Sequence, residues 1–186
     1  MKKLASVSLV LVGLWVPTVL FAWPQFAAHG EPSAPMEGVH AEVLGVYFTP
    51  PVGAAAAIVQ AIDASEREVL VQAYGFTHNA IAQALVRAHQ RGVSVHVLLD
   101  KKSKASNRYV IDLLTQDQID VRQDGKHAIA HNKVMVIDER LVITGSFNFT
   151  NSAETRNAEN FLVLKSPELA HQYKAQWRHH WAHGEQ

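Results

Sequence analysis

Runs of strand type alternate with runs of helical type, and this alternation restricts the fold more than any other feature of the chain. Short runs rich in β-branched residues occupy 41–48, 67–76, 93–100, 119–124 and 158–165. Apolar residues at helical spacing fill 50–66, 77–92, 108–114 and the segment from 167 onward. In the second helix we expect Thr77 to be the cap and Gly92 the end. The pattern predicts an α/β fold with a mixed β-sheet flanked by helices on both faces.

The first 28 residues differ from the rest of the chain. Two lysines precede an apolar run that carries no charge before Glu31, which is typical of a signal peptide and predicts a periplasmic or secreted protein. The same run could instead remain as an N-terminal membrane anchor. Residues 29–39 contain prolines and read as a linker, so we expect the folded domain at 40–186.

Composition removes several classes of site. The chain has no cysteine, which excludes disulfides, thiolate catalysis and cysteine zinc sites. Its formal net charge is zero, so any argument for a nucleic-acid partner must rest on a local group of charges.

Polar side chains interrupt an otherwise apolar segment at 131–154. We expect two strands, 131–137 and 141–149, joined by a turn at the sequence DER. A loop of two or of four residues gives one register, in which His131 lies opposite Asn148 and Lys133 opposite Ser146.

Five side chains are therefore expected to converge on one patch. The third strand adds Glu159, whose carboxylate could accept a hydrogen bond from the His131 imidazole. An imidazole, a cation and neutral donors suit a phosphoryl group. Asp138 falls on the opposite strand face, which makes it a turn or structural residue.

The pattern HxKx4Dx6GSxN, from His131 to Asn148, resembles the signature of the phospholipase D superfamily. The surrounding residues, roughly 40–182, are similar to the small bacterial exported endonuclease branch. The resemblance implies a phospholipase D-like half fold and a phosphodiesterase that works through a phosphohistidine, without cofactor or metal. It implies that His131 is the nucleophile or acid, that Lys133 and Asn148 bind phosphate, that Ser146 assists and that Glu159 orients His131. The catalytic candidates are His131, Lys133, Asp138 and Glu159, among which Asp138 belongs to the family motif although its strand face keeps it out of direct contact with substrate. The phosphate-binding candidates are Lys133, Ser146 and Asn148.

In-line displacement requires a proton donor on the far side of phosphorus from the nucleophile. The chain carries one HxK motif, so we expect a homodimer with a shared active site. His127 or His78 of the same chain is the alternative acid.

Two further groups of residues each allow two interpretations. Lys101, Lys102 and Lys104 follow a strand end and could bind a phosphate backbone, or could belong to a solvated loop. His179 and His183 have the i, i+4 spacing of zinc ligands, but no HExxH carboxylate accompanies them, which favours a helix end with cations. Trp177 and Trp181 are expected to pack rather than to stack on bases.

Three functions remain open at this point. The first is a non-specific endonuclease acting on DNA, or on RNA. The second is a phospholipase D-type lipid phosphodiesterase that hydrolyses, for example, cardiolipin. The third is a non-catalytic nucleic-acid-binding module, against which the intact His131 and Lys133 argue, because binding alone does not require the imidazole.

Overall fold

The computed structural model describes residues 38–51 and 53–186. The expected signal peptide or anchor at 1–28 lies outside the described residues, as does most of the expected linker. Among the residues that are described, no helix combines the length and the apolar character needed to cross a bilayer.

A seven-stranded mixed sheet forms the centre of the domain, in the order β1-β7-β6-β5-β2-β3-β4. The strands are β1 (Glu42–Thr49), β2 (Glu68–Ala73), β3 (Ser94–Asp100), β4 (Asp120–Asp124), β5 (Lys133–Ile137), β6 (Leu141–Gly145) and β7 (Glu159–Lys165). The pairs β2–β3 and β3–β4 are parallel, and the other pairs are antiparallel. The expected mixed sheet is confirmed.

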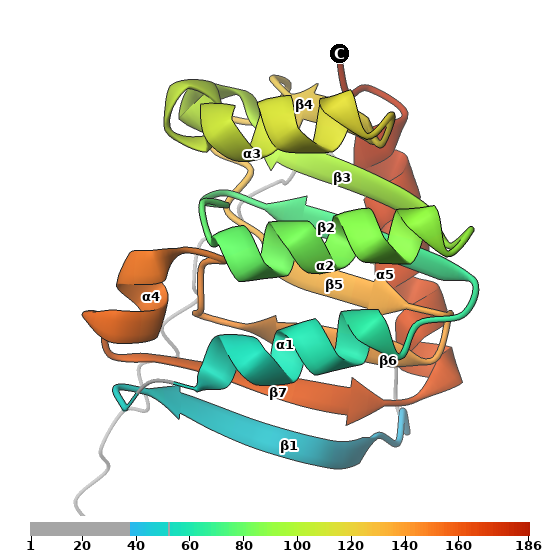
Figure 1. Cartoon of the computed structure of the whole chain (residues 1–186). Coiled ribbons are helices and arrows are strands. Elements are labelled where there is room, and N and C mark those ends of the chain that lie inside the picture. Colours follow the sequence, from blue (N-terminus) through green and yellow to red (C-terminus); the bar gives the residue numbers. More distant parts are fainter. Residues whose placement is uncertain (1–37, 52) are drawn as a thin grey trace, which may run out of the picture. The chain divides into compact units, whose positions relative to one another are not determined.

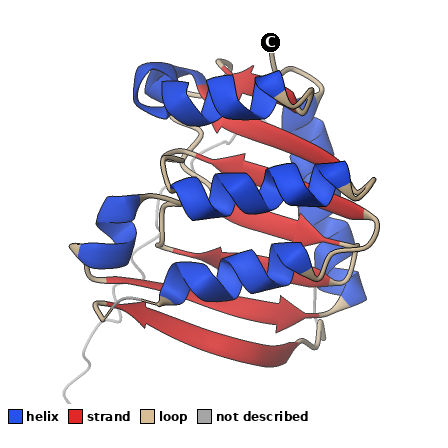
Figure 2. Cartoon of the chain, viewed as in Figure 1, coloured by secondary structure: helices blue, strands red, loops and turns tan. Residues whose placement is uncertain are grey.

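Helices cover both faces of this sheet, as predicted (Figure 1). On one face lie α1 (Ala54–Asp63), α2 (Asn79–Gln90) and α3 (Lys104–Gln116), the last preceded by the 3-10 turn η1 (Lys101–Ser103). The other face carries α5 (Pro167–Trp181), and the short helix α4 (Asn151–Thr155) lies at one sheet edge (Figure 2). Because both faces are covered, β2 and β5 are buried along nearly their whole length and consist mostly of apolar residues.

The helix α5 packs against the sheet through Trp177 and Trp181. Trp177 is buried and its indole Nε1 donates to the carbonyl of Val71 at 2.9 Å. Its ring stacks on Trp181 with the ring centroids 4.6 Å apart. Trp177 and Trp181 therefore pack against each other, as expected.

Two predicted helix boundaries were wrong. His78, not Thr77, is the cap residue of α2, and its side chain makes no capping hydrogen bond. The expected polar loop at 101–107 is instead η1 and the first turn of α3, because the Asp100 carboxylate accepts from the backbone N–H of Ser103 and starts the helical turn. Gly92 follows α2 with φ of 90°, as its role at the helix end requires.

The predicted register between β5 and β6 was also wrong, by one residue. Val134 pairs with Thr144 and Ile137 with Leu141, so the loop contains three residues, 138–140, rather than two or four. Asp138 and Glu139 both have positive φ, near 55° and 53°, which makes a tight turn with one additional residue before β6. In addition, His131 precedes β5, and β6 ends at Gly145 instead of continuing to 149.

Candidate active site

The candidate residues still meet, although the predicted register was wrong, because the strands bring them to one edge of the sheet. This edge contains the ends of β2, β3 and β6 and the beginnings of β5 and β7, close to α4 (Figure 1). The segment that precedes β5 carries His131, and the segment after β6 carries Ser146 and Asn148. Glu159 is the first residue of β7.

His131 and Lys133 form the centre of the site together with Tyr74. The His131 imidazole is exposed and lies edge-on to the Tyr74 ring, with the ring centroids 4.9 Å apart. Lys133 is 8% exposed, and its ammonium donates to the carbonyl of His131 at 2.8 Å. The same ammonium lies 5.5 Å from the centroid of the Tyr74 ring. An accessible imidazole and a cation held by the His131 carbonyl therefore share the Tyr74 ring as a neighbour.

Burial lowers the pKa of the Lys133 ammonium, and the negative charge of Glu159 acts in the opposite direction. A cation in this environment is poorly hydrated. It gains more from an incoming anion than an exposed lysine does, because water competes less for its protons.

Glu159 does not have the partner that the sequence suggested. Its carboxylate accepts from the hydroxyl of Ser146 at 2.6 Å and from the side-chain amide of Asn157 at 2.9 Å. Within the described residues, no hydrogen bond joins Glu159 to His131. The Ser146 hydroxyl also accepts from the backbone N–H of Asn160 at 3.1 Å. To bind a phosphate, Ser146 must exchange its bond to Glu159 for one to a phosphate oxygen.

Asn148 lies against Gly75, the second residue after β2. A Cβ on Gly75 would be 3.5 Å from the Asn148 Oδ1 and 3.2 Å from the methyl group of Thr150. This Oδ1 is shielded from solvent and has no hydrogen-bond partner among the residues that the structure describes. The amide therefore packs against the backbone after β2, and the tighter limit on a side chain at position 75 is the Thr150 methyl group.

Tyr74 and the polar groups that hold it were not predicted from the sequence. The carbonyl of Tyr74 accepts from the Ser103 hydroxyl at 2.6 Å and from the Asn107 amide at 2.8 Å. Asn107 is fully buried, and its Oδ1 accepts from the backbone N–H of Phe76. The only sequence signal was an aromatic residue and a glycine directly after a buried strand, where ligand sites of α/β sheets occur.

Asp138 lies in the turn at the end of β5 that is remote from His131. Its buried carboxylate accepts from the backbone N–H groups of Glu66, Arg67 and Glu68, with the shortest distance 2.8 Å. Burial alone raises the pKa of this carboxyl, but the backbone donors outweigh burial and the pKa is lowered. Asp138 thus fastens the β5–β6 turn to the start of β2, as the structural interpretation expected, and it is not placed among the reacting groups.

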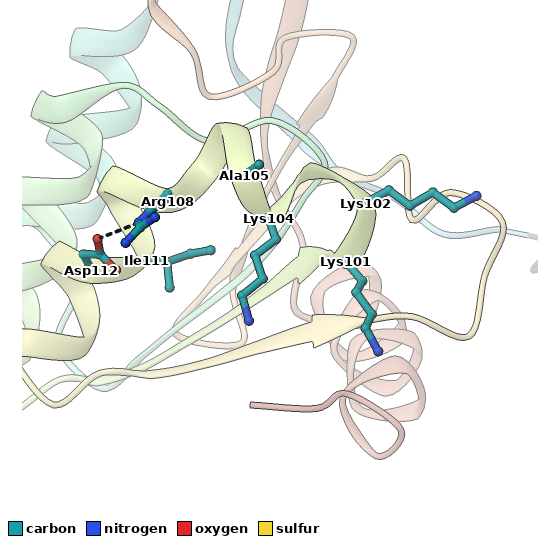
Figure 3. Close-up of a pocket in the computed structure, with 7 residues that line it drawn as sticks. All are labelled: Lys101, Lys102, Lys104, Ala105, Arg108, Ile111 and Asp112. Atoms are coloured by element: carbon teal, nitrogen blue, oxygen red, sulfur yellow. Dashed lines mark ion pairs between the residues drawn. The ribbon is translucent and has the colours of Figure 1, made fainter.

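The basic residues after β3 border an open cavity of about 550 Å³ on α3 (Figure 3). Lys101, Lys102, Lys104 and Arg108 all contribute to its lining. Lys101 also pairs with Glu185 at 2.6 Å, and Arg108 lies 3.6 Å from Asp112. Asp100 directly precedes these lysines, and its carboxylate accepts from the backbone N–H of Ala130 at 2.8 Å. This hydrogen bond connects the basic segment to the segment that carries His131.

The two alternative acids have other surroundings. His127 lies 2.8 Å from the buried Asp124 carboxylate and stacks on His180, so it belongs to another group of side chains. His78 is half-buried at the start of α2. Its burial lowers the pKa of the imidazole, while the charge of Glu154 raises it.

Comparison with known families shows which family the chain is similar to. Residues 58–181 match the family model described as "Cardiolipin synthase, PLD-like domain". A relative from Rickettsia prowazekii named "Phospholipase D" is 47% identical over 133 residues, which are 70% of this chain and 63% of the relative. The mouse "Mitochondrial cardiolipin hydrolase" is 30% identical over 67% of this chain and 56% of its own length. The match thus spans less than two thirds of either relative.

Two solved structures match the chain over nearly their whole length. Nuc from Salmonella typhimurium, titled a phospholipase D family member, is 34% identical, with a TM-score of 0.75 over 78% of this chain and 97% of Nuc. NucT from Helicobacter pylori has a TM-score of 0.69 at 24% identity, covering 75% of this chain and 96% of NucT, and supports the fold alone.

Proposed function

The chain belongs to the phospholipase D superfamily, and we propose that it is a metal-independent phosphodiesterase that hydrolyses DNA. One observation carries the proposal: the exposed His131 imidazole and the Lys133 ammonium both lie beside the Tyr74 ring at a sheet edge, and this ammonium, on a buried side chain, donates to the His131 carbonyl. The lysine provides the fixed positive charge, and the imidazole provides the nucleophile.

The proposed reaction has two steps. A neutral His131 imidazole attacks phosphorus and displaces the alcohol oxygen, forming a phosphohistidine, and water then attacks that phosphorus and releases the imidazole. Lys133, Asn148 and Ser146 stabilise the charge that develops on the phosphoryl oxygens. A buried ammonium is effective in this role because it is already oriented before the substrate arrives.

Basic residues next to the site favour DNA as the substrate. Lys102, Lys104 and Arg108 line the open cavity on α3, and α3 supports Tyr74 through Asn107. A group of cations beside the turn that holds Tyr74 suits a polymer with one charge per phosphate. The length over which Nuc matches, 97% of that chain, agrees with a small single-motif nuclease.

A lipid diester is the second candidate. Phe48, which pairs with Asn160 of β7, is 66% exposed, and Ile129, two residues before His131, is 53% exposed. Apolar side chains at the border of a polar site could enter a lipid surface. The names of the Rickettsia and mouse relatives point in the same direction.

The experiment that separates these functions uses one protein preparation and two substrates, both with excess chelator. Supercoiled plasmid reports DNA cleavage, and vesicles that contain labelled cardiolipin report lipid hydrolysis. Cleavage of plasmid with intact lipid supports the proposal, and the reverse result assigns the lipid function. Binding of DNA without cleavage of either substrate would show a binding module and refute the enzyme.

We further propose that two chains share one active site, because a single HxK motif supplies one imidazole and in-line displacement uses two. A two-fold axis brings a second His131 without further sequence. Differently tagged wild-type and His131→Ala chains, co-expressed and purified as heterodimers, should be almost inactive. Half of the wild-type rate would contradict the shared site and would favour His127 or His78 as the acid.

Export to the periplasm or beyond is part of the same proposal and can be tested by cell fractionation.

A further inference from the structure

A second group of polar side chains lies apart from the proposed reacting groups, between β4 and α5. Asp124 is the last residue of β4, His127 is in the loop that follows, and His180 and His183 are at the end of α5. The Asp124 carboxylate is 2.8 Å from Nδ1 of His127, 3.1 Å from Nδ1 of His180 and 3.3 Å from Nε2 of His183. One possible ligand atom from each residue, an imidazole nitrogen or a carboxylate oxygen, lies within 4.8 Å of the other three.

These distances are close to those of a tetrahedral metal centre. With zinc–ligand bonds of about 2.0–2.1 Å, neighbouring ligand atoms are about 3.3 Å apart. Nδ1 of His127 and Nδ1 of His180 are 2.8 and 3.1 Å from Oδ2 of Asp124, and Nε2 of His183 is 3.3 Å from Oδ1. The four ligand atoms lie within 4.8 Å of one another, so some of them need to approach by up to about 1.5 Å. The imidazole rings also converge, with centroid separations of 4.6 Å for His127–His180, 5.4 Å for His127–His183 and 5.6 Å for His180–His183.

Burial and the surrounding amides fit the same geometry. The Asp124 side chain is fully buried, and those of His180, His183 and His127 are 11%, 19% and 41% exposed, so the group is open to solvent on the His127 side. The Gln176 amide lies 2.8 Å from Nε2 of His180, where it can fix the ring once Nδ1 is a ligand. The Gln72 amide, 3.1 Å from that Nδ1, must then turn aside.

A plain hydrogen-bond network is the alternative, and it explains less. Asp124 accepts from the backbone N–H of Lys126, and hydrogen bonds also join it to Nδ1 of His127 and Nδ1 of His180. Nε2 of His183, however, is shielded from solvent and has no hydrogen-bond partner among the described residues, although it lies 3.3 Å from the carboxylate. Three nitrogen ligands and one oxygen ligand are, in contrast, a common set for zinc.

We propose that Asp124, His127, His180 and His183 bind one divalent transition-metal ion, with Zn²⁺ the best match. The ion joins the end of β4, the β4–β5 loop and the C-terminal end of α5. The sequence analysis had paired His183 with His179 and interpreted both as helix-end cations. In the structure, the neighbours of His183 in this group are instead His127, His180 and Asp124.

The position of the site gives the ion a structural role. His131 lies four residues after His127 in the same loop. A metal bond at His127 would hold the loop at that residue, so fewer loop residues before the proposed nucleophile His131 could move. The ion does not contact the diester in this proposal, so it is compatible with a metal-independent reaction and stands whether or not that reaction is correct.

The test is zinc binding by the purified full chain after removal of metals with a chelator. Titration followed by metal analysis should give one Zn²⁺ per chain, and Co²⁺ should give the visible spectrum of a tetrahedral site. Zinc at about a hundred times its Kd should raise the Tm by roughly 5–10 °C. His183→Ala and Asp124→Asn should lower the affinity at least 100-fold.

His179→Ala is the matched control, because His179 is the exposed neighbour of His180 on the same helix and its ring lies 5.9 Å from that of His183. It should bind zinc as the wild type does. Circular dichroism without metal shows whether each variant is folded. If Asp124→Asn does not fold, His127→Ala, which removes the most exposed ligand, replaces it. Absence of 1:1 binding in the wild type, or equal binding by His183→Ala and His179→Ala in the folded state, would overturn the site.

Discussion

Replacing Asp138 by asparagine should destabilise the protein and leave its chemistry nearly intact. Asparagine tolerates the positive φ at this position as well as aspartate does, so the backbone needs no change. The carboxylate accepts three backbone N–H groups, whereas an amide that takes its place brings one acceptor oxygen and sets its NH₂ against a backbone donor. With charge-assisted hydrogen bonds at about 1.5–3 kcal/mol each, we expect a loss of roughly 2–4 kcal/mol in the free energy of unfolding.

For a domain of this size, that loss corresponds to a fall in Tm of about 5–15 °C, which thermal unfolding followed by circular dichroism measures directly. The matched control is Asp63→Asn, because Asp63 pairs with Arg87 at 2.8 Å on the surface, where such a pair contributes under about 1 kcal/mol. At 20 °C, both variants should hydrolyse substrate within threefold of the wild-type rate. An unchanged Tm for Asp138→Asn, or a large loss of rate without a loss of Tm, would refute the structural role.

The same variant also predicts a pH dependence. The pKa of Asp138 is lower in the folded protein than the ordinary value of about 3.9, so its stabilisation is complete above that value and is lost as the pH falls toward the folded pKa. The difference in Tm between wild type and Asp138→Asn should therefore be constant near neutral pH and shrink on acidification below about pH 4. A difference that stays constant down to acid denaturation would contradict this origin.

Two further predictions concern the site itself. Lys133→Met should reduce kcat by about 10²–10³-fold with an intact fold, because it removes the fixed cation beside the phosphoryl group. This loss should be far larger than that of Asp138→Asn, as measured by the initial rates of the folded variants, and equal losses would contradict the prediction. Gly145→Ala should lower the Tm by roughly 2–12 °C, because a Cβ there would collide with the carbonyl of Asn160 and the Cα of Phe161; a Tm equal to that of the wild type would show that β7 can move away.

The layered fold could be predicted from the sequence because the apolar periodicity of each element is a local property. Helix and strand runs alternate, and buried strands such as β5 consist almost entirely of apolar residues. The start of α3 was missed because the side chain of Asp100 begins the turn, and a run of lysines and serines gives no apolar pattern there.

Candidate residues were found more reliably than their contacts. Strand pairing depends on the number of residues in the turn, and the three-residue loop that contains Asp138 shifted the register by one. His131, Lys133 and Ser146 nevertheless lie at the same end of the sheet, since antiparallel pairing places the start of β5 beside the end of β6. The partner of Glu159 depended on side-chain distances that no spacing rule provides, as did the group around Asp124.

The central claim is that His131 is the nucleophile of a metal-independent phosphodiesterase. The most direct measurement is the initial rate of hydrolysis of bis(p-nitrophenyl) phosphate, a diester that favours neither DNA nor lipid, in excess chelator. We expect a measurable rate for the wild type and for His179→Ala, and a rate at least about a thousandfold lower for His131→Ala with an unchanged circular dichroism spectrum. A rate for His131→Ala within tenfold of wild type, or a wild-type rate that disappears with chelator while the fold persists, would contradict the account.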